Sequence, residues 1–157
     1  MSDATWIDAC ALADVDAAAA AHRGLGVEAG DRWLSVFRAR DGVLTCVETP
    51  CPHAGHRLCD GYAADPVDVE DLVSDVGVLV ACPAHAYVYD TKSGSCLASF
   101  GAGAGRAVAH AARAVDGRVL VDPLPARVPP RTLDKPTSDV VGMRCVELAL
   151  AVKYPEE

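Results

Sequence analysis

Cys51-Pro52-His53-Ala54-Gly55 and Cys82-Pro83-Ala84-His85 are the two stretches of this chain that decide its fold. Each contains one cysteine and one histidine, and each has a proline directly after the cysteine. Thiolate is the soft ligand that holds the iron of iron–sulfur clusters, and neutral imidazole also binds iron. Two of each at one point suit a [2Fe-2S] cluster in which sulfur ligates one iron and nitrogen the other. The prolines predict stiff loops that hold these ligands in place.

Zinc is the alternative metal for the same four side chains, because two cysteines and two histidines also form a tetrahedral zinc site. The familiar zinc pattern places both cysteines before both histidines, whereas this chain alternates them. The single residue between Cys51 and His53 is also fewer than the common zinc spacing requires. The sequence therefore favours an iron–sulfur cluster and leaves structural zinc as the alternative.

Both loops resemble those of Rieske-type ferredoxins beyond the ligands themselves. The first, C-P-H-A-G-H-R-L over residues 51–58, is similar to the family pattern C-x-H-x-G-x-x-L. The second, C-P-A-H-A-Y-V-Y-D-T-K-S-G, is similar to C-P-x-H-x-x-x-F/Y-D-x-x-T/S-G, so the likeness continues through Asp90 to Gly94. The resemblance covers roughly residues 6–122 and is most specific at the two loops.

This resemblance implies a bound [2Fe-2S] cluster and a set of cofactor-binding and metal-ligating residues, with no catalytic residue. Cys51 and Cys82 are the implied thiolate ligands of one iron, and His53 and His85 are the implied imidazole ligands of the other, nearer the surface. Tyr89 stands where a tyrosine hydroxyl of the respiratory members bonds a ligand sulfur. Its other interpretation is an aromatic side chain packed in a strand.

Short strands separated by turns predict an all-β fold, with Rieske-type antiparallel sheets and hairpins and a small cluster-binding subdomain. Asp41-Gly42 and Asp116-Gly117 each lie between two apolar runs, which is the signature of a two-residue hairpin turn. One alanine-rich stretch, residues 15–22, has helix propensity instead. The expected strands are 33–38, 43–47, 78–81, 86–90, 107–115 and 118–121.

The chain divides into a Rieske domain over residues 1–122, with the cluster-binding loops within about 49–100, and a C-terminal extension over 123–157. The extension starts with a proline-rich linker. Between residues 146 and 152, apolar residues then alternate with alanine and charged ones. This period of two predicts one more strand, at the edge of a sheet.

Twenty-eight residues separate His53 from Cys82, more than is usual in bacterial ferredoxins of this family. The segment 60–75 within this stretch is acidic and rich in turn residues. One interpretation is a solvated surface insertion. The other is an acidic lip beside the cluster, in which Asp68, Glu70 and Asp71 attract a basic partner.

Composition narrows the classes of partner. A formal net charge of −8 at pH 7 excludes nucleic acid and anionic membrane surfaces, both of which need a basic patch, and suits a basic face on a redox protein. The N-terminal residues are acidic where a signal peptide is basic, and the most apolar run, 76–89, is too short for a membrane anchor. Cys59 and the other non-ligand cysteines are expected to be reduced thiols. We expect a soluble, cytoplasmic monomer.

These observations predict a soluble Rieske-type ferredoxin that carries single electrons from a reductase donor to an oxygenase or similar acceptor. We expect no enzyme, because an oxygenase needs a second, mononuclear iron site, which His110 and a short tail do not supply. The alternative is a structural zinc- or cluster-binding interaction or accessory domain without redox turnover.

Overall fold

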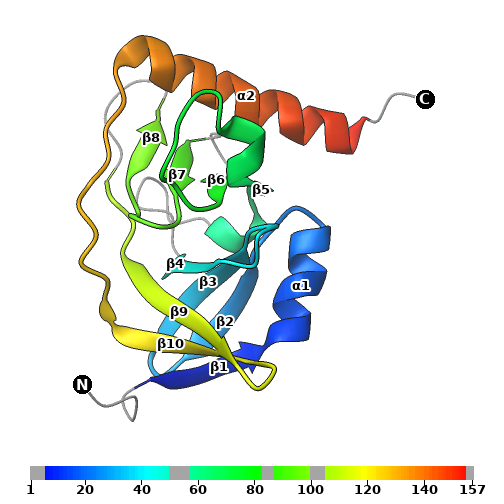
Figure 1. The fold of residues 1–157 in the computed structure, drawn as a ribbon, viewed down its shortest axis with the longest axis vertical. Coiled ribbons are helices and arrows are strands. Elements are labelled where there is room, and N and C mark those ends of the chain that lie inside the picture. The colour runs from blue at the N-terminus through cyan, green and yellow to red at the C-terminus, as the bar shows by residue number, and fades with distance from the viewer. Residues whose placement is uncertain (1–5, 50–56, 83–86, 100–104, 155–157) are drawn as a thin grey trace.

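The computed structural model describes residues 6–49, 57–82, 87–99 and 105–154. Three layers are stacked along the long axis of the molecule: a six-stranded sheet, a four-stranded sheet and the long helix α2 (Figure 1). One apolar core lies between the two sheets, and a second lies between the four-stranded sheet and α2. The mostly antiparallel β architecture confirms the predicted fold class.

The six-stranded sheet is antiparallel throughout, in the order β1-β10-β9-β4-β3-β2. Its end strands β1 and β2 contact one another, so the sheet curls towards a barrel. Helix α1 packs against it through the buried Val15. The elements of this layer are β1 (Ile7–Ala11), α1 (Leu12–Ala20), β2 (Leu25–Ala29), β3 (Arg32–Arg38), β4 (Leu44–Glu48), β9 (Ala109–Val115) and β10 (Arg118–Pro125).

The predicted hairpins and the predicted helix are confirmed in this layer. β3 pairs with β4 across Gly42, whose φ is +93°, and β9 pairs with β10 across Asp116 and Gly117. Asp116 and Gly117 both have positive φ, at 50° and 76°, as a type I′ turn requires. The alanine-rich stretch forms α1, although the helix begins earlier in the chain than its alanines suggest.

The four-stranded sheet has the order β5-β6-β7-β8 and is also antiparallel. The carboxylate of the fully buried Asp90 organises the turn after β7, because it accepts hydrogen bonds from Gly77 N (2.9 Å), Lys92 N (3.0 Å) and Ser93 Oγ (2.8 Å). Gly94 ends that turn with φ +81°. The elements are the short 3-10 helices η2 (Leu58–Asp60) and η3 (Pro66–Val69), and the strands β5 (Tyr62–Ala64), β6 (Leu79–Ala81), β7 (Val88–Asp90) and β8 (Cys96–Ala98).

The C-terminal extension folds as a strap and a helix, so the prediction of an edge strand over 146–152 is wrong. Residues 126–134 run back along the two sheets to α2 (Lys135–Lys153). Arg131 N donates to Ser95 Oγ at 2.8 Å, and Ser138 Oγ donates to Leu97 O at 2.7 Å. Alanine, leucine, glutamate and lysine are good helix formers, and burial of Val141 and Cys145, four residues apart, selects the helical period.

Helix α2 covers one face of the four-stranded sheet, contacting its edge strands β5 and β8. Within the described part of the chain, no helix is long and apolar enough to cross a membrane.

Candidate metal centre

The stems of the two predicted ligand loops are each closed by a backbone hydrogen bond. At the first, Leu58 N donates to Thr49 O at 2.9 Å, and at the second, Cys82 N donates to Tyr87 O at 2.7 Å. Residues 50–56 and 83–86, between these stems, lie outside the described residues. Cys51, His53 and His85 are among them and stay predicted ligands. Cys82 is the one predicted ligand that the structure places.

The two stems lie side by side. Gly61, just after η2, packs so closely on β6 that a Cβ on it would lie 1.9 Å from Ala81 O. Ala81 directly precedes Cys82. Leu58, from the first stem, shares one core cluster with Cys82 and Tyr87 from the second. The two loops therefore leave the fold at neighbouring points, as a site with ligands from both loops requires.

The surroundings of Cys82 suit a cluster ligand. Its side chain is 2% exposed, and its core cluster includes Leu58, Val80 and Tyr89. An apolar shell around a metal ligand controls the access of water and thereby the reduction potential of the metal. Tyr89 in the same cluster is 0% exposed, and a buried phenol requires a hydrogen-bond partner for its hydroxyl. The described part of the site fits a [2Fe-2S] cluster.

The stem of the first loop is fixed by residues that the sequence did not single out. Thr49 N donates to Trp33 O at 2.9 Å, and Thr49 Oγ1 lies 3.2 Å from Ser35 Oγ in the buried interior. The neighbouring Glu48 lies beside the buried His110. No sequence spacing predicts the roles of Ser35 and His110. These residues lie in β3 and β9, and only strand pairing brings them next to the stem of the first loop.

The acidic segment 60–75 is held by basic side chains rather than left as an open acidic surface. Arg144 of α2 donates two hydrogen bonds to the Asp71 carboxylate, at 2.8 and 2.9 Å, and Arg40 donates two to Asp68, at 3.1 and 2.9 Å. Lys92 Nζ lies 2.6 Å from Asp75 Oδ1. The guanidinium of Arg144 lowers the pKa of Asp71, and the ammonium of Lys92 lowers that of Asp75. This pairing favours the interpretation as a surface insertion.

Cys59, the cysteine that follows the first loop, has a packing role. It is 2% exposed, Arg57 Nη2 lies 3.6 Å from its Sγ, and a Cβ on Gly26 of β2 would lie 2.9 Å from that sulfur.

Burial also raises the pKa of the Cys145 thiol to about 11, so Cys145 is protonated at neutral pH. Cys10, Cys46, Cys59 and Cys145 form no disulfide, as expected for reduced thiols.

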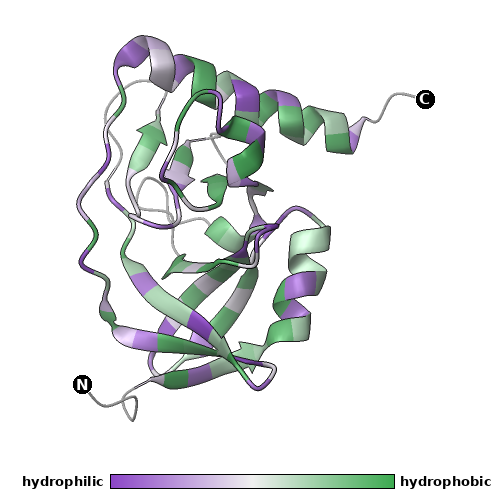
Figure 2. Cartoon of the chain, viewed as in Figure 1, coloured by the Kyte–Doolittle hydropathy of each residue, from purple (hydrophilic) through white to green (hydrophobic). Residues whose placement is uncertain are grey.

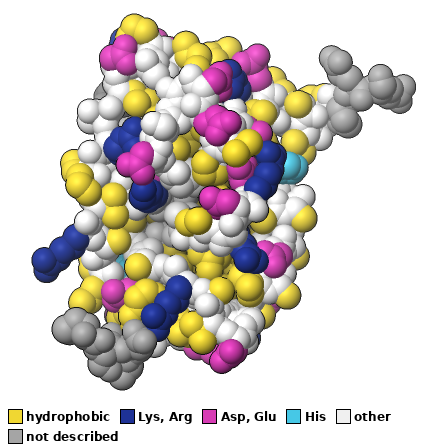
Figure 3. Space-filling model, in the orientation of Figure 1, with side chains coloured by type: hydrophobic (Ala, Val, Ile, Leu, Met, Phe, Trp, Pro, Cys, Tyr) yellow, Lys and Arg dark blue, Asp and Glu magenta, His cyan; other side chains and the backbone are white. Residues whose placement is uncertain are grey.

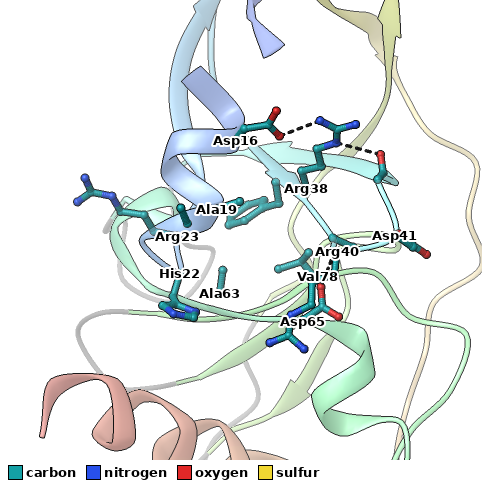
Figure 4. A pocket seen from close by; sticks show the side chains of 14 residues that line it. Asp16, Ala19, His22, Arg23, Arg38, Arg40, Asp41, Ala63, Asp65 and Val78 are labelled. Atoms are coloured by element: carbon teal, nitrogen blue, oxygen red, sulfur yellow. Dashed lines mark hydrogen bonds and ion pairs between the residues drawn. The ribbon is translucent and has the colours of Figure 1, made fainter. Parts of the chain in front are cut away.

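A pocket of about 720 Å³ lies apart from the loop stems, between α1, the β3–β4 turn and the segment around β5 (Figure 4). Two of its carboxylates have partners: Arg38 Nη1 lies 2.8 Å from Asp16 Oδ1, and the backbone N–H of Arg40 donates to Asp65 Oδ1 at 2.7 Å. Cys82, the predicted ligand that the structure describes, does not line this pocket. Across the described ranges, no three His, Cys, Asp or Glu residues gather as a metal site.

Solved structures with the same fold include proteins much longer than this chain. NdmB of Pseudomonas putida CBB5 is 18% identical with a TM-score of 0.59, over 74% of this chain and 34% of that one. NdmA of the same organism, solved with caffeine, is 20% identical with a TM-score of 0.57, over 74% and 32%. Dicamba monooxygenase bound to dicamba is 22% identical with a TM-score of 0.56, over 80% and 34%. The chain thus spans about a third of their length.

No curated protein sequence matches the chain. The family described as the Rieske [2Fe-2S] domain matches residues 5–104, which include both loops, their stems and the four-stranded sheet. A match over well over half of the chain, on the fold just described, settles the family and its cofactor. The protein belongs to the Rieske [2Fe-2S] domain family, and its Rieske domain is an electron-transfer module that binds a [2Fe-2S] cluster.

Proposed function

We propose that the protein is a Rieske-type ferredoxin that carries single electrons from a reductase to an oxygenase or similar acceptor in the cytoplasm. The observation that carries this proposal is the adjacency of the two loop stems, with Cys82 buried where they meet. In this proposal Cys51 and Cys82 supply the thiolates, and His53 and His85 supply the imidazoles.

When bound, the [2Fe-2S] cluster takes up and releases one electron, and imidazole ligation raises its potential above that of all-cysteine clusters. The chain supplies a rigid frame for this chemistry. Cys82 follows directly on β6, and its N–H is fixed to Tyr87 O, so its thiolate has little freedom to move. Burial among Val80 and Tyr89 keeps water from the sulfur. A rigid, dry ligand reduces the rearrangement that accompanies each change of charge.

The packing of the C-terminal residues supports a carrier. Residues 126–153 pack back onto the Rieske domain, with Val141 and Cys145 of α2 buried against the four-stranded sheet. The net charge of −8 supports basic docking faces on the donor and the acceptor.

A reductive titration followed by electron paramagnetic resonance tests this function, together with iron and acid-labile sulfide analysis. We expect two irons and two sulfides per chain, a reversible one-electron reduction and the spectrum of a nitrogen-ligated cluster. Zinc in place of iron would remove the proposal. A bound cluster that cannot be reduced reversibly would favour the alternative function, an accessory domain without redox turnover.

Cys82→Ser and Cys59→Ser form a matched pair for the ligand assignment, because both thiols are 2% exposed and lie near the loop stems. We expect Cys82→Ser to lose the visible absorption and the iron, since serine replaces a soft thiolate by a poor ligand for the cluster. Cys59→Ser is expected to keep both. Equal iron contents in the two variants would show that Cys82 is not a ligand.

A further inference from the structure

Helix α2 has two apolar faces, of which the fold uses one. The inner face is buried: Val141 and Cys145 are 0% and 1% exposed in the core between α2 and the four-stranded sheet, and Leu148 packs against that core. The outer face is not buried by the rest of the chain. Val140, Met143, Leu150 and Tyr154 are 48–66% exposed.

These four exposed residues form one continuous line, the outer stripe. Val140, Met143, Glu147 and Leu150 follow steps of three, four and three residues, so they share one side of the helix, and Tyr154 follows four residues later at its C-terminal cap. The stripe is about 21 Å long at 1.5 Å per residue. Figure 2 shows hydrophobic residues alternating with hydrophilic ones along α2, and Figure 3 shows hydrophobic side chains, with charged ones among them, at the surface along the top of the molecule, where α2 runs.

A solvent-facing helix surface is normally polar, and an aligned apolar stripe marks an interaction site. The last turn of α2 projects beyond the body of the fold (Figure 1). Val152, on the same side of the helix as Cys145, is exposed there. Glu147 in the middle of the stripe and Asp139 at its edge disfavour an anionic membrane surface as the occupant. A protein partner with a matching apolar stripe suits the surface better.

We propose that the partner is a second copy of this chain, and that the two α2 helices pack antiparallel through their outer stripes. With the two-fold axis passing at the level of residue 145, Val140 faces Leu150 of the second copy, and Met143 faces Glu147. A two-fold axis makes each contact occur twice, so this one patch is self-complementary.

The charges that flank the stripe select the antiparallel direction. Asp139 lies at the N-terminal end of α2 and Lys153 at its C-terminal end. In the antiparallel pair each Asp139 stands within two residues, about 3 Å along the axis, of Lys153 of the second copy. A parallel pair would instead place like charges together at both ends, which disfavours that arrangement.

Sedimentation equilibrium of the cluster-loaded protein over a wide concentration range measures this association. We expect a monomer–dimer equilibrium, and Leu150→Glu should raise the dissociation constant at least about tenfold, which corresponds to about 1.4 kcal/mol. Glu147→Leu should lower it, because this change removes the one charge from the stripe. Val43→Glu is the matched control: Val43 is 56% exposed in the β3–β4 turn, and its substitution should leave the equilibrium unchanged.

A charge exchange tests the direction of pairing. Asp139→Lys and Lys153→Asp should each weaken the dimer, and the double variant should restore it. Circular dichroism of each variant checks that α2 is intact, since Asp139 also contacts Lys135 at 3.4 Å. A protein that stays monomeric at every concentration overturns the proposal. So do equal effects of Leu150→Glu and Val43→Glu, or a double variant that is no stronger than the single ones.

Discussion

His110 Nε2 lies 3.0 Å from Glu48 Oε2, while the other ring nitrogen of His110 lies 2.9 Å from the carbonyl oxygen of Asp122. Each ring nitrogen of His110 therefore has a polar partner inside the fold. The side chain of His110 is 0% exposed. It joins β9 and β10 to the end of β4, next to the stem of the first loop.

Replacing His110 by leucine is expected to destabilise the fold by about 1–3 kcal/mol, because the Asp122 carbonyl and the Glu48 carboxylate lose a buried hydrogen-bond partner. Denaturant unfolding measures the change. Arg32→Gln is the control, because Arg32 Nη1 donates to the same Glu48 oxygen at 2.8 Å but lies in solvent, where such a pair contributes about 0–1 kcal/mol. Equal losses of stability in the two variants would show that burial gives the contacts of His110 no greater contribution to stability than the exposed ion pair of Arg32.

Gly61→Ala tests the contact between the two loop stems. Its Cβ would lie 1.9 Å from Ala81 O, so the backbone of η2 or of β6 has to move. We expect a loss of about 1–3 kcal/mol in stability and a lower iron content, because the stems move apart. Gly117→Ala separates the loss of stability from the contact between the stems. Its Cβ meets nothing within 4 Å, but the φ of +76° strains an alanine, so we expect this variant to lose stability and to keep its iron content.

Asp71→Asn tests the link between the acidic segment and α2 through its pH dependence. Arg144 lowers the pKa of Asp71 below its ordinary 3.8. The ion pair therefore adds stability fully above pH 3.8, and that stability is lost as the pH falls through the lower folded-state value. The variant should melt at a lower temperature than the native protein at pH 7, and the two melting temperatures should converge in acid.

Glu70→Gln is the control for Asp71→Asn, since Glu70 makes no ion pair with any described residue. Both variants remove one negative charge from the same segment. If Asp71→Asn and Glu70→Gln slowed the reduction of the protein by a basic partner equally at low salt, the result would support the interpretation of this segment as an acidic docking surface. We expect the stability effect to be confined to Asp71→Asn.

Tyr89→Phe removes one hydroxyl from the core that contains Cys82. If that hydroxyl bonds a ligand sulfur, it stabilises the more negative reduced state, so its removal should lower the reduction potential. A net hydrogen bond of about 0.5–1.5 kcal/mol corresponds to roughly 20–60 mV for one electron. Potentiometric titration measures the shift. An unchanged potential with a normal fold would leave Tyr89 a packing role.

Local signals explain which parts of the fold the sequence predicts. The Asp-Gly pairs determine two hairpins because positive φ at the turn is a property of the turn residues themselves. Asp90 and Gly94 likewise act within a few residues of β7. The prediction of an edge strand was wrong because the seven residues 146–152, with alternating apolar side chains, fit a period of two. The helix is instead determined by the burial of Val141 and Cys145 against the four-stranded sheet, whose strands come from earlier in the chain.

The candidate site also combines features that local sequence patterns predict with features that only the tertiary fold creates. The ligand pairs and the family follow from short motifs, whereas the pairing of Asp71 with Arg144 joins residues 73 positions apart. No local pattern indicates such a contact. Ser35, His110 and Gly61 also gain their roles only from strand pairing and close packing.

The first loop begins after β4, on the six-stranded sheet, and ends at η2 beside β6, whereas the second loop starts and finishes within the four-stranded sheet. The two predicted ligand pairs therefore meet only after the sheets have docked. A newly synthesised chain has to complete its tertiary fold before it can receive a cluster. We expect iron uptake during maturation to report on the folding of the whole domain, so that a destabilising change far from the ligands shows first as protein lacking iron.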